Sequence, residues 1–179
     1  MILIKTAKKK VIEKKISLID RCKKRCKELK QYKELVKKYK KDADLIDGVT
    51  IRFCEDIDTT ARTTNGEICL NNKLLNREED VILRYILHEI VHVFQHIENE
   101  GKKVKKKDKD NYLFDEREVE AFTYQLDYQE EQEGNVEEYL EHLFNFHDLD
   151  KKEKDEVLDD LTVKLDNKDE VKDNILNDD

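Results

Sequence analysis

The chain has 179 residues, 37% of them hydrophobic and 44% charged, with four glycines, four cysteines and no proline. This composition supports one packed core and excludes a second of similar size, and the scarcity of helix breakers favours long helices, so we expect a mostly α member of the α+β class. No uncharged stretch approaches the roughly 20 residues of a membrane helix, which indicates a soluble, intracellular protein of the cytoplasm.

The net charge of −8 divides unevenly along the chain. Residues 1–47 hold 17 Lys and Arg against 7 Asp and Glu, whereas residues 115–179 hold 7 against 24. Two solvated helical faces that attract each other explain this asymmetry, and a basic arm for nucleic acid is the alternative. We therefore divide the chain into a basic N-terminal helix (1–47), a core (48–150) and an acidic helical tail (151–179).

The N-terminal segment predicts a long amphipathic helix from about Ala7 to Lys41. Its apolar residues recur mainly at steps of three and four, as on one helical face. They are Ile12, Ile16, Ile19, Cys22, Cys26, Leu29, Val36 and Tyr39. Lysines occupy the other faces.

Two short strands are expected next. Residues 49–54 alternate and are rich in β-branched side chains, and residues 67–71 alternate after the turn signal of residues 63–66. We expect these strands to form a small antiparallel sheet beside the following helix. An edge strand there would suit an extended peptide that binds by strand addition.

The next helix is apolar all round, which indicates burial. Asn76 is the expected N-cap, with Glu79 completing a capping box. His88 and His92 lie four residues apart on this helix, about 40° apart in direction and roughly 6 Å along the axis, so both rings can reach one metal ion. Glu89 points aside from that line and is the candidate general base.

The remaining elements are less distinctive. Residues 99–110 form a polar, lysine-rich connection, and helices are expected over about 115–132, ending before Gly134, and over about 136–147. The pattern beyond residue 150 permits one last helix, with the final dozen residues frayed.

Two histidines do not complete a zinc site, which ordinarily has at least three protein ligands. His96 lies roughly 12 Å along the helix from His88, too far to share its ion unless the helix bends sharply. Glu118 is the better candidate, because Ala121 and Phe122 give its helix a buried side next to it. Glu120 and Glu116 are the alternatives.

The stretch from Leu87 to His96, together with Glu118 to Phe122, resembles the zincin metallopeptidases of the gluzincin type, including small ImmA/IrrE-like domains. This resemblance covers about residues 49–147. It implies zinc as the cofactor and supports Glu118 as the third ligand, since such families place a glutamate three residues before a helical alanine. Many gluzincins have an aspartate four residues after that glutamate to orient a histidine, whereas this chain has Phe122.

The leading functional hypothesis is a zinc metalloendopeptidase in which Glu89 takes a proton from the water that attacks a peptide bond. The residue that would donate a hydrogen bond to the oxyanion is not singled out by the sequence, and the candidates are Tyr124, Tyr128, His142 and His147. The alternatives are a noncatalytic zincin-like scaffold that binds a protein partner, and a nucleic-acid-associated module that uses the basic helix. Little aromatic interleaving and the lack of a helix-turn-helix pattern argue against direct nucleic-acid binding.

Four cysteines complete the candidate residues: Cys22, Cys26, Cys54 and Cys69. They do not form paired Cys-x-x-Cys knuckles, and a chain of this size does not need disulfides to fold. We therefore expect reduced thiols.

Overall fold

The computed structural model describes residues 2–99 and 109–177, and the chain divides into two compact units, 1–102 and 103–179. The structure confirms the α+β class with mostly helical content. Each unit buries apolar side chains of its own, whereas composition predicts a single core. The three segments expected from the charge distribution stay a prediction.

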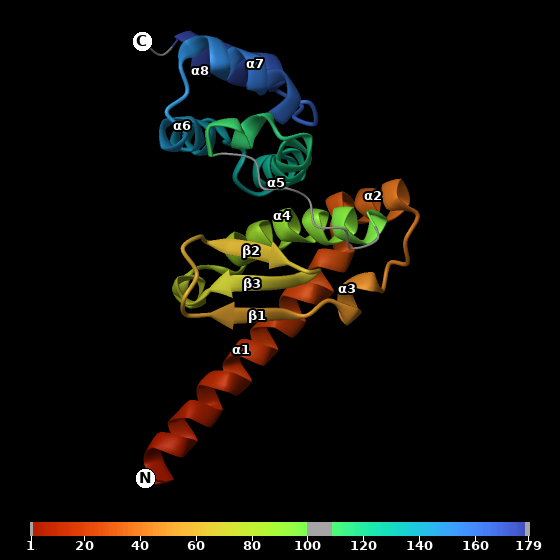
Figure 1. The fold of residues 1–179 in the computed structure, drawn as a ribbon, viewed down its shortest axis with the longest axis vertical. Coiled ribbons are helices and arrows are strands. Elements are labelled where there is room, and N and C mark those ends of the chain that lie inside the picture. Colours follow the sequence, from red (N-terminus) through yellow and green to blue (C-terminus); the bar gives the residue numbers. More distant parts are fainter. Residues whose placement is uncertain (1, 100–108, 178–179) are drawn as a thin grey trace. The chain divides into compact units, whose positions relative to one another are not determined.

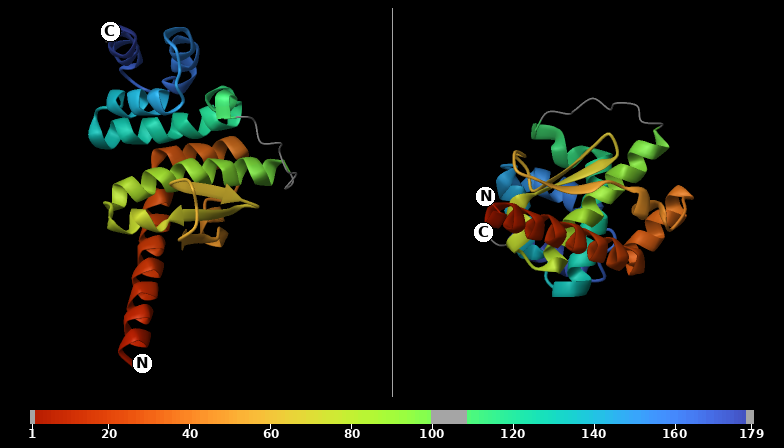
Figure 2. Two further views of the ribbon diagram at one scale, coloured as in Figure 1. Left: turned by 60° about the vertical axis from the view of Figure 1, so that its left-hand side comes forward. Right: turned by 90° about the horizontal axis from the view of Figure 1, so that it is seen from below.

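The first unit combines helices with a three-stranded sheet (Figure 1). Its elements are α1 (Ile2–Glu28), α2 (Lys30–Tyr39), α3 (Leu45–Gly48), β1 (Ile51–Cys54), β2 (Ala61–Thr64), β3 (Glu67–Asn71), the 3₁₀ helix η1 (Asn72–Asn76) and α4 (Glu79–Glu98). The sheet lies against α4 through β2 and β3, as expected from the sequence. The N-terminal half of α1 extends beyond the sheet (Figures 1 and 2).

The single helix expected over residues 7–41 is wrong, because the structure has two helices, α1 and α2. Leu29 interrupts them with an extended backbone, φ −65° and ψ 140°. This break turns α2 onto α4, where Tyr32 and Tyr39 place their ring centroids 6.0 and 5.4 Å from that of Phe94. Tertiary packing of these rings, which the local periodicity does not encode, explains the difference.

The sheet is mixed, which corrects the expected antiparallel pairing. Its order is β1-β3-β2, with β1 parallel and β2 antiparallel to β3. The hairpin between β2 and β3 turns at Asn65 and Gly66, which both have positive φ, as the turn signal indicated. A strand is predicted from alternating apolar and polar residues, which reflect one buried face. β2 has no fully buried residue, so its sequence lacks this alternation.

Two of the cysteines are bonded to each other, so the expectation of four thiols is wrong. Cys54 and Cys69 form a disulfide between neighbouring strands β1 and β3, with Cα atoms 5.9 Å apart. Strand register brings them together, and spacing in the sequence does not reveal register. Cys22 and Cys26 are free and buried, and burial raises the pKa of Cys22 to about 12.

The start of α4 also differs from the expectation. Asn76 ends η1, and Glu78 is the N-cap residue without a side-chain cap bond. Glu79 instead accepts bonds from Arg21 (3.0 Å) and Arg25 (3.4 Å) of α1. Ion pairs with the basic helix thus replace the predicted capping box.

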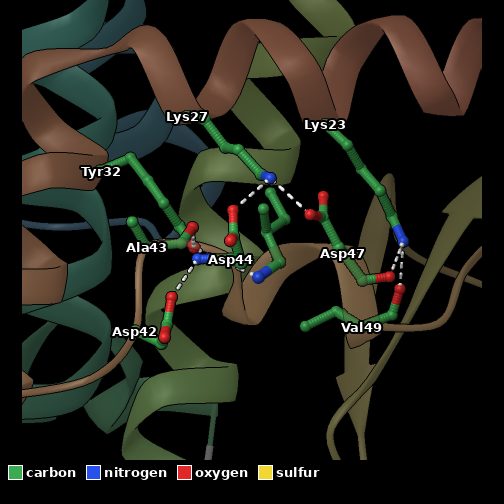
Figure 3. Close-up of polar contacts among 9 residues, drawn as sticks. Lys23, Lys27, Tyr32, Asp42, Ala43, Asp44, Asp47 and Val49 are labelled. Carbon is green, nitrogen blue, oxygen red and sulfur yellow. Dashed lines mark hydrogen bonds and ion pairs between the residues drawn. The ribbon is translucent and has the colours of Figure 1, made fainter.

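A polar cluster ties α1 and α2 to α3 (Figure 3). Lys23 Nζ donates to the carbonyl oxygens of Asp47 (3.1 Å) and Val49 (2.6 Å), at the entry to β1. Tyr32 donates its hydroxyl to the Ala43 carbonyl (3.0 Å) and accepts from the Ile46 amide (3.2 Å). Lys27 pairs with Asp44 and Asp47, as the dashed lines of Figure 3 show. These bonds fix where β1 begins.

The second unit is a helical assembly. Its elements are the 3₁₀ helix η2 (Lys109–Phe114), α5 (Glu116–Glu133), α6 (Glu137–Phe146), α7 (Lys151–Leu161) and α8 (Lys168–Asn177). Figure 2 shows α7 and α8 together at one side of this unit, where α7 packs on α5 and α8 on α6. The bounds of α5 and α6 confirm the predicted helices, and Asp115 and Gly134 cap α5.

The C-terminal region is more ordered than expected. Two helices occupy it where one was predicted, and α8 covers residues that were expected to fray. Val171 and Ile175 anchor α8 in the core of this unit, beside Leu158 and Leu161 of α7. Of the connection expected over 99–110, residues 100–108 lie outside the described part, and Lys109 begins η2. In the described part of the chain, every helix is too short or too polar to cross a bilayer.

Candidate metal centre

The His-Glu-x-x-His pattern lies in the middle of α4, where the helix is most deeply buried. His88 and Glu89 expose only 5% and 6% of their surface. Ile86, Leu87 and Ile90 around them are fully buried. His92, one turn further along, is partly buried. Burial of an imidazole and a carboxylate is costly unless they find partners.

The two imidazoles face each other. Nε2 of His88 and Nε2 of His92 are 3.3 Å apart, and the ring planes cross at 74°. Two nitrogens bound to zinc at about 2.05 Å with a tetrahedral angle lie about 3.4 Å apart. The spacing of this pair therefore fits two corners of a tetrahedral zinc site.

The other nitrogen of His92 contacts a glutamine. His92 Nδ1 lies 2.9 Å from Oε1 of Gln95, one turn further along α4. Because an amide oxygen only accepts, this bond requires the proton on Nδ1 and leaves Nε2 with its lone pair, as a metal ligand needs. Sequence reasoning missed Gln95, although its i,i+3 spacing from His92 was the available signal.

Glu89 is attached to the sheet through its backbone. Thr63 Oγ1 of β2 donates to the carbonyl oxygen of Glu89 at 3.0 Å. This bond adds to the packing of α4 against β2 and holds β2 beside Glu89. The β2–β3 hairpin is therefore attached directly to the His-Glu-x-x-His segment.

His96 lies in the last turn of α4, eight residues beyond His88. A Cβ placed on Gly66 would come within 3.3 Å of its Cδ2, so the ring packs against the hairpin turn.

Glu118 belongs to the second unit. It lies in the first turn of α5 and is partly buried, with Ala121 and Phe122 buried on the following turn. Of the two alternatives, Glu116 is exposed and Glu120 is partly buried. The structure thus brings His88 and His92 together within one unit, and the role of Glu118 as third ligand stays a prediction.

The four candidate oxyanion donors differ in their surroundings. Tyr124 and Tyr128 are buried, and Lys164 Nζ lies 4.6 Å from the ring centroid of Tyr124. His147 stacks on Tyr112 with centroids 5.3 Å apart and planes 7° from parallel, whereas His142 is exposed. These contacts give Tyr124 and His147 packing roles within the second unit.

Comparison with known proteins gives no match: no family model, curated protein or solved structure is significantly similar to this chain.

Proposed function

We propose that the chain is a zinc-dependent metalloendopeptidase that hydrolyses peptide bonds in a protein substrate. The observation that carries this proposal is the 3.3 Å separation of the two Nε2 atoms beside the buried Glu89. A divalent metal ion would bind the two Nε2 atoms and hold a water molecule beside the Glu89 carboxylate.

Zinc is the proposed ion because imidazole is one of its preferred ligands and because the nitrogen spacing suits its tetrahedral geometry. We propose Glu118 as the third ligand, with Glu120 and Glu116 as the alternatives. Its support is the pattern of α5, in which a partly buried carboxylate precedes buried Ala121 and Phe122. This arrangement is the one expected of a gluzincin.

Glu89 is the proposed general base. A bound zinc ion would supply Lewis acidity that lowers the pKa of a water molecule to about 7. The Glu89 carboxylate would accept the proton of that water and pass it to the leaving amine.

The substrate would be an extended peptide that pairs with β2. This strand lies at an edge of the sheet and is bonded to the Glu89 carbonyl through Thr63. Strand addition at an edge recognises the peptide backbone, which suits an enzyme that cleaves peptide bonds. β2 would then hold the scissile bond beside Glu89.

The test compares the full-length protein with Glu89→Gln on zinc content and on cleavage of a fluorescence-quenched peptide library. We expect Glu89→Gln to keep its zinc and to lose cleavage by about 10²-fold or more, since it removes the proton acceptor alone. Glu98→Gln, an exposed position on the same helix, is the matched control. Undiminished cleavage by Glu89→Gln would refute the assignment.

A second candidate function is a noncatalytic scaffold that binds an acidic protein partner through α1. Val11, Ile12 and Ile16 of α1 are 51%, 57% and 55% exposed, and exposed lysines such as Lys10 and Lys14 accompany them. An apolar patch with basic neighbours suits an acidic amphipathic surface. This function predicts zinc binding without hydrolysis, and partner binding that Ile12→Glu abolishes.

Nucleic-acid binding through the same basic helix is the other alternative. Binding of duplex DNA whose affinity falls steeply with salt, and which is lost when the exposed Lys10 and Lys14 are both replaced by Glu, would favour it.

The proposed location is the cytoplasm. The two free thiols Cys22 and Cys26 are compatible with a reducing compartment, whereas the Cys54–Cys69 disulfide is more usual in an oxidising one. Alkylation of acid-quenched cells, followed by mass spectrometry, would test this location. Alkylated Cys54 and Cys69 would support a reducing compartment, and a bonded pair would support an oxidising one.

A further inference from the structure

The orientation of His92 depends on a neighbour that is not a metal ligand. An imidazole binds a metal through one nitrogen only when the proton is held on the other, so a hydrogen-bond acceptor at that second nitrogen sets the binding state. In the first unit this acceptor is Gln95, whose Oε1 lies 2.9 Å from Nδ1 of His92.

Gln95 is itself held in place. It exposes only 6% of its surface, and its backbone carbonyl accepts from the amide (3.1 Å) and from the side-chain Nδ2 (2.8 Å) of Asn99. These bonds secure the last turn of α4, from which the Gln95 side chain reaches back by one turn. A buried amide on a secured turn has little freedom to rotate away from His92.

We propose that Gln95 is a positioning residue that locks His92 in the Nδ1–H tautomer and directs the Nε2 lone pair toward Nε2 of His88. The inference rests on the proposed metal site and deepens it. Because the acceptor is a neutral amide, it orients the ring without the added basicity that a carboxylate confers on a ligand imidazole. We therefore expect zinc to bind less tightly with Gln95 than with a carboxylate at this position.

Two substitutions separate orientation from basicity. Gln95→Met keeps the length and the packing of the side chain but removes the acceptor, and we expect zinc to bind about 10- to 100-fold more weakly. Gln95→Glu is acceptor-only when ionised, so we expect zinc to bind at least as tightly as in the unchanged protein. Weaker zinc binding by Gln95→Glu would show that an acceptor at this position does not favour the metal-binding tautomer, which would overturn the proposal.

Gln31→Met is the matched control, because Gln31 is a fully buried glutamine of the same unit on α2. It reports the cost of losing a buried amide away from the histidines. Zinc affinity is measured by competition with a chromophoric chelator, in the full-length protein and its three variants. Equal weakening in Gln95→Met and Gln31→Met would mean that Gln95 has only a structural role.

A second readout needs no metal. Long-range ¹H–¹⁵N correlation spectra of the histidine rings report which nitrogen carries the proton in the zinc-free protein. We expect the Nδ1–H tautomer of His92 in the unchanged protein and in Gln31→Met, and loss of that preference in Gln95→Met. An unchanged tautomer in Gln95→Met would overturn the proposal whether or not zinc binds, whereas absence of zinc binding with the expected tautomers would contradict the proposed function alone.

Discussion

At the scale of single residues, burial makes polar groups depend on particular partners. Tyr32 is almost fully buried, and its hydroxyl satisfies one carbonyl and one amide of the segment around α3. Burial raises the pKa of Tyr32 to about 12 from its ordinary 10.0. The protonated phenol is therefore the form that the folded chain favours, and its stabilising effect, complete below pH 10, is lost as the pH rises toward 12.

Tyr32→Phe tests this dependence. We expect the free energy of unfolding at neutral pH to fall by about 1–3 kcal/mol, because the variant leaves a buried carbonyl and amide without their hydroxyl. Alkaline titration of tyrosinate absorbance should lose one late-ionising group. Tyr85→Phe, at a half-buried position, is the control, and a Tyr32→Phe titration curve with the late step intact would contradict the assignment.

At the scale of elements, the sequence predicted what local patterns determine. The i,i+4 spacing of His88 and His92 was enough to predict that their rings face each other. Asp115 and Gly134 were enough to predict where α5 begins and ends. Non-local contacts determined the rest. The break at Leu29 follows from rings packing on Phe94, and parallel pairing and the disulfide follow from strand register.

The β2–β3 hairpin should respond to a single methyl group at its turn. Gly66 has φ +79°, and a Cβ there would come within 3.3 Å of His96. We expect Gly66→Ala to lower the free energy of unfolding by about 1 kcal/mol or more, from strain and from this contact. Gly48→Ala is the control, because nothing lies within 4 Å of its Cβ position, and urea unfolding measures both. Equal effects at the two glycines would contradict the account of the turn.

The bond between β2 and α4 gives a second prediction at this scale. Thr63→Val keeps the β-branched shape but removes the donor to the Glu89 carbonyl. We expect a loss of about 0.5–1.5 kcal/mol in the free energy of unfolding and lower peptidase activity, since the strand is no longer bonded to the motif. Thr64→Val, at an exposed neighbouring position, should leave both quantities unchanged. If Thr63→Val changes neither the free energy of unfolding nor the activity, the bond does not join the hairpin to the site.

At the scale of the whole molecule, metal binding would link to folding. A ligand that binds only the native chain adds about 2.7 kcal/mol of stability at a concentration 100 times its dissociation constant. We expect zinc to raise the melting temperature of the full-length protein and His92→Ala to abolish the rise. Glu118→Ala should weaken the effect, whereas Glu131→Ala, at an exposed position near the other end of α5, should leave it unchanged. If Glu118→Ala does not weaken the effect, the third ligand is another acid.

The most direct test of the central claim is the zinc content of the purified full-length protein beside that of His88→Ala and His92→Ala, measured by elemental analysis after dialysis against a weak chelator. We expect one zinc ion per chain in the unchanged protein and little in either variant, because the two Nε2 atoms hold adjacent corners of one site. A zinc-free unchanged protein, or variants that keep their zinc, would contradict the claim that these histidines form a metal centre.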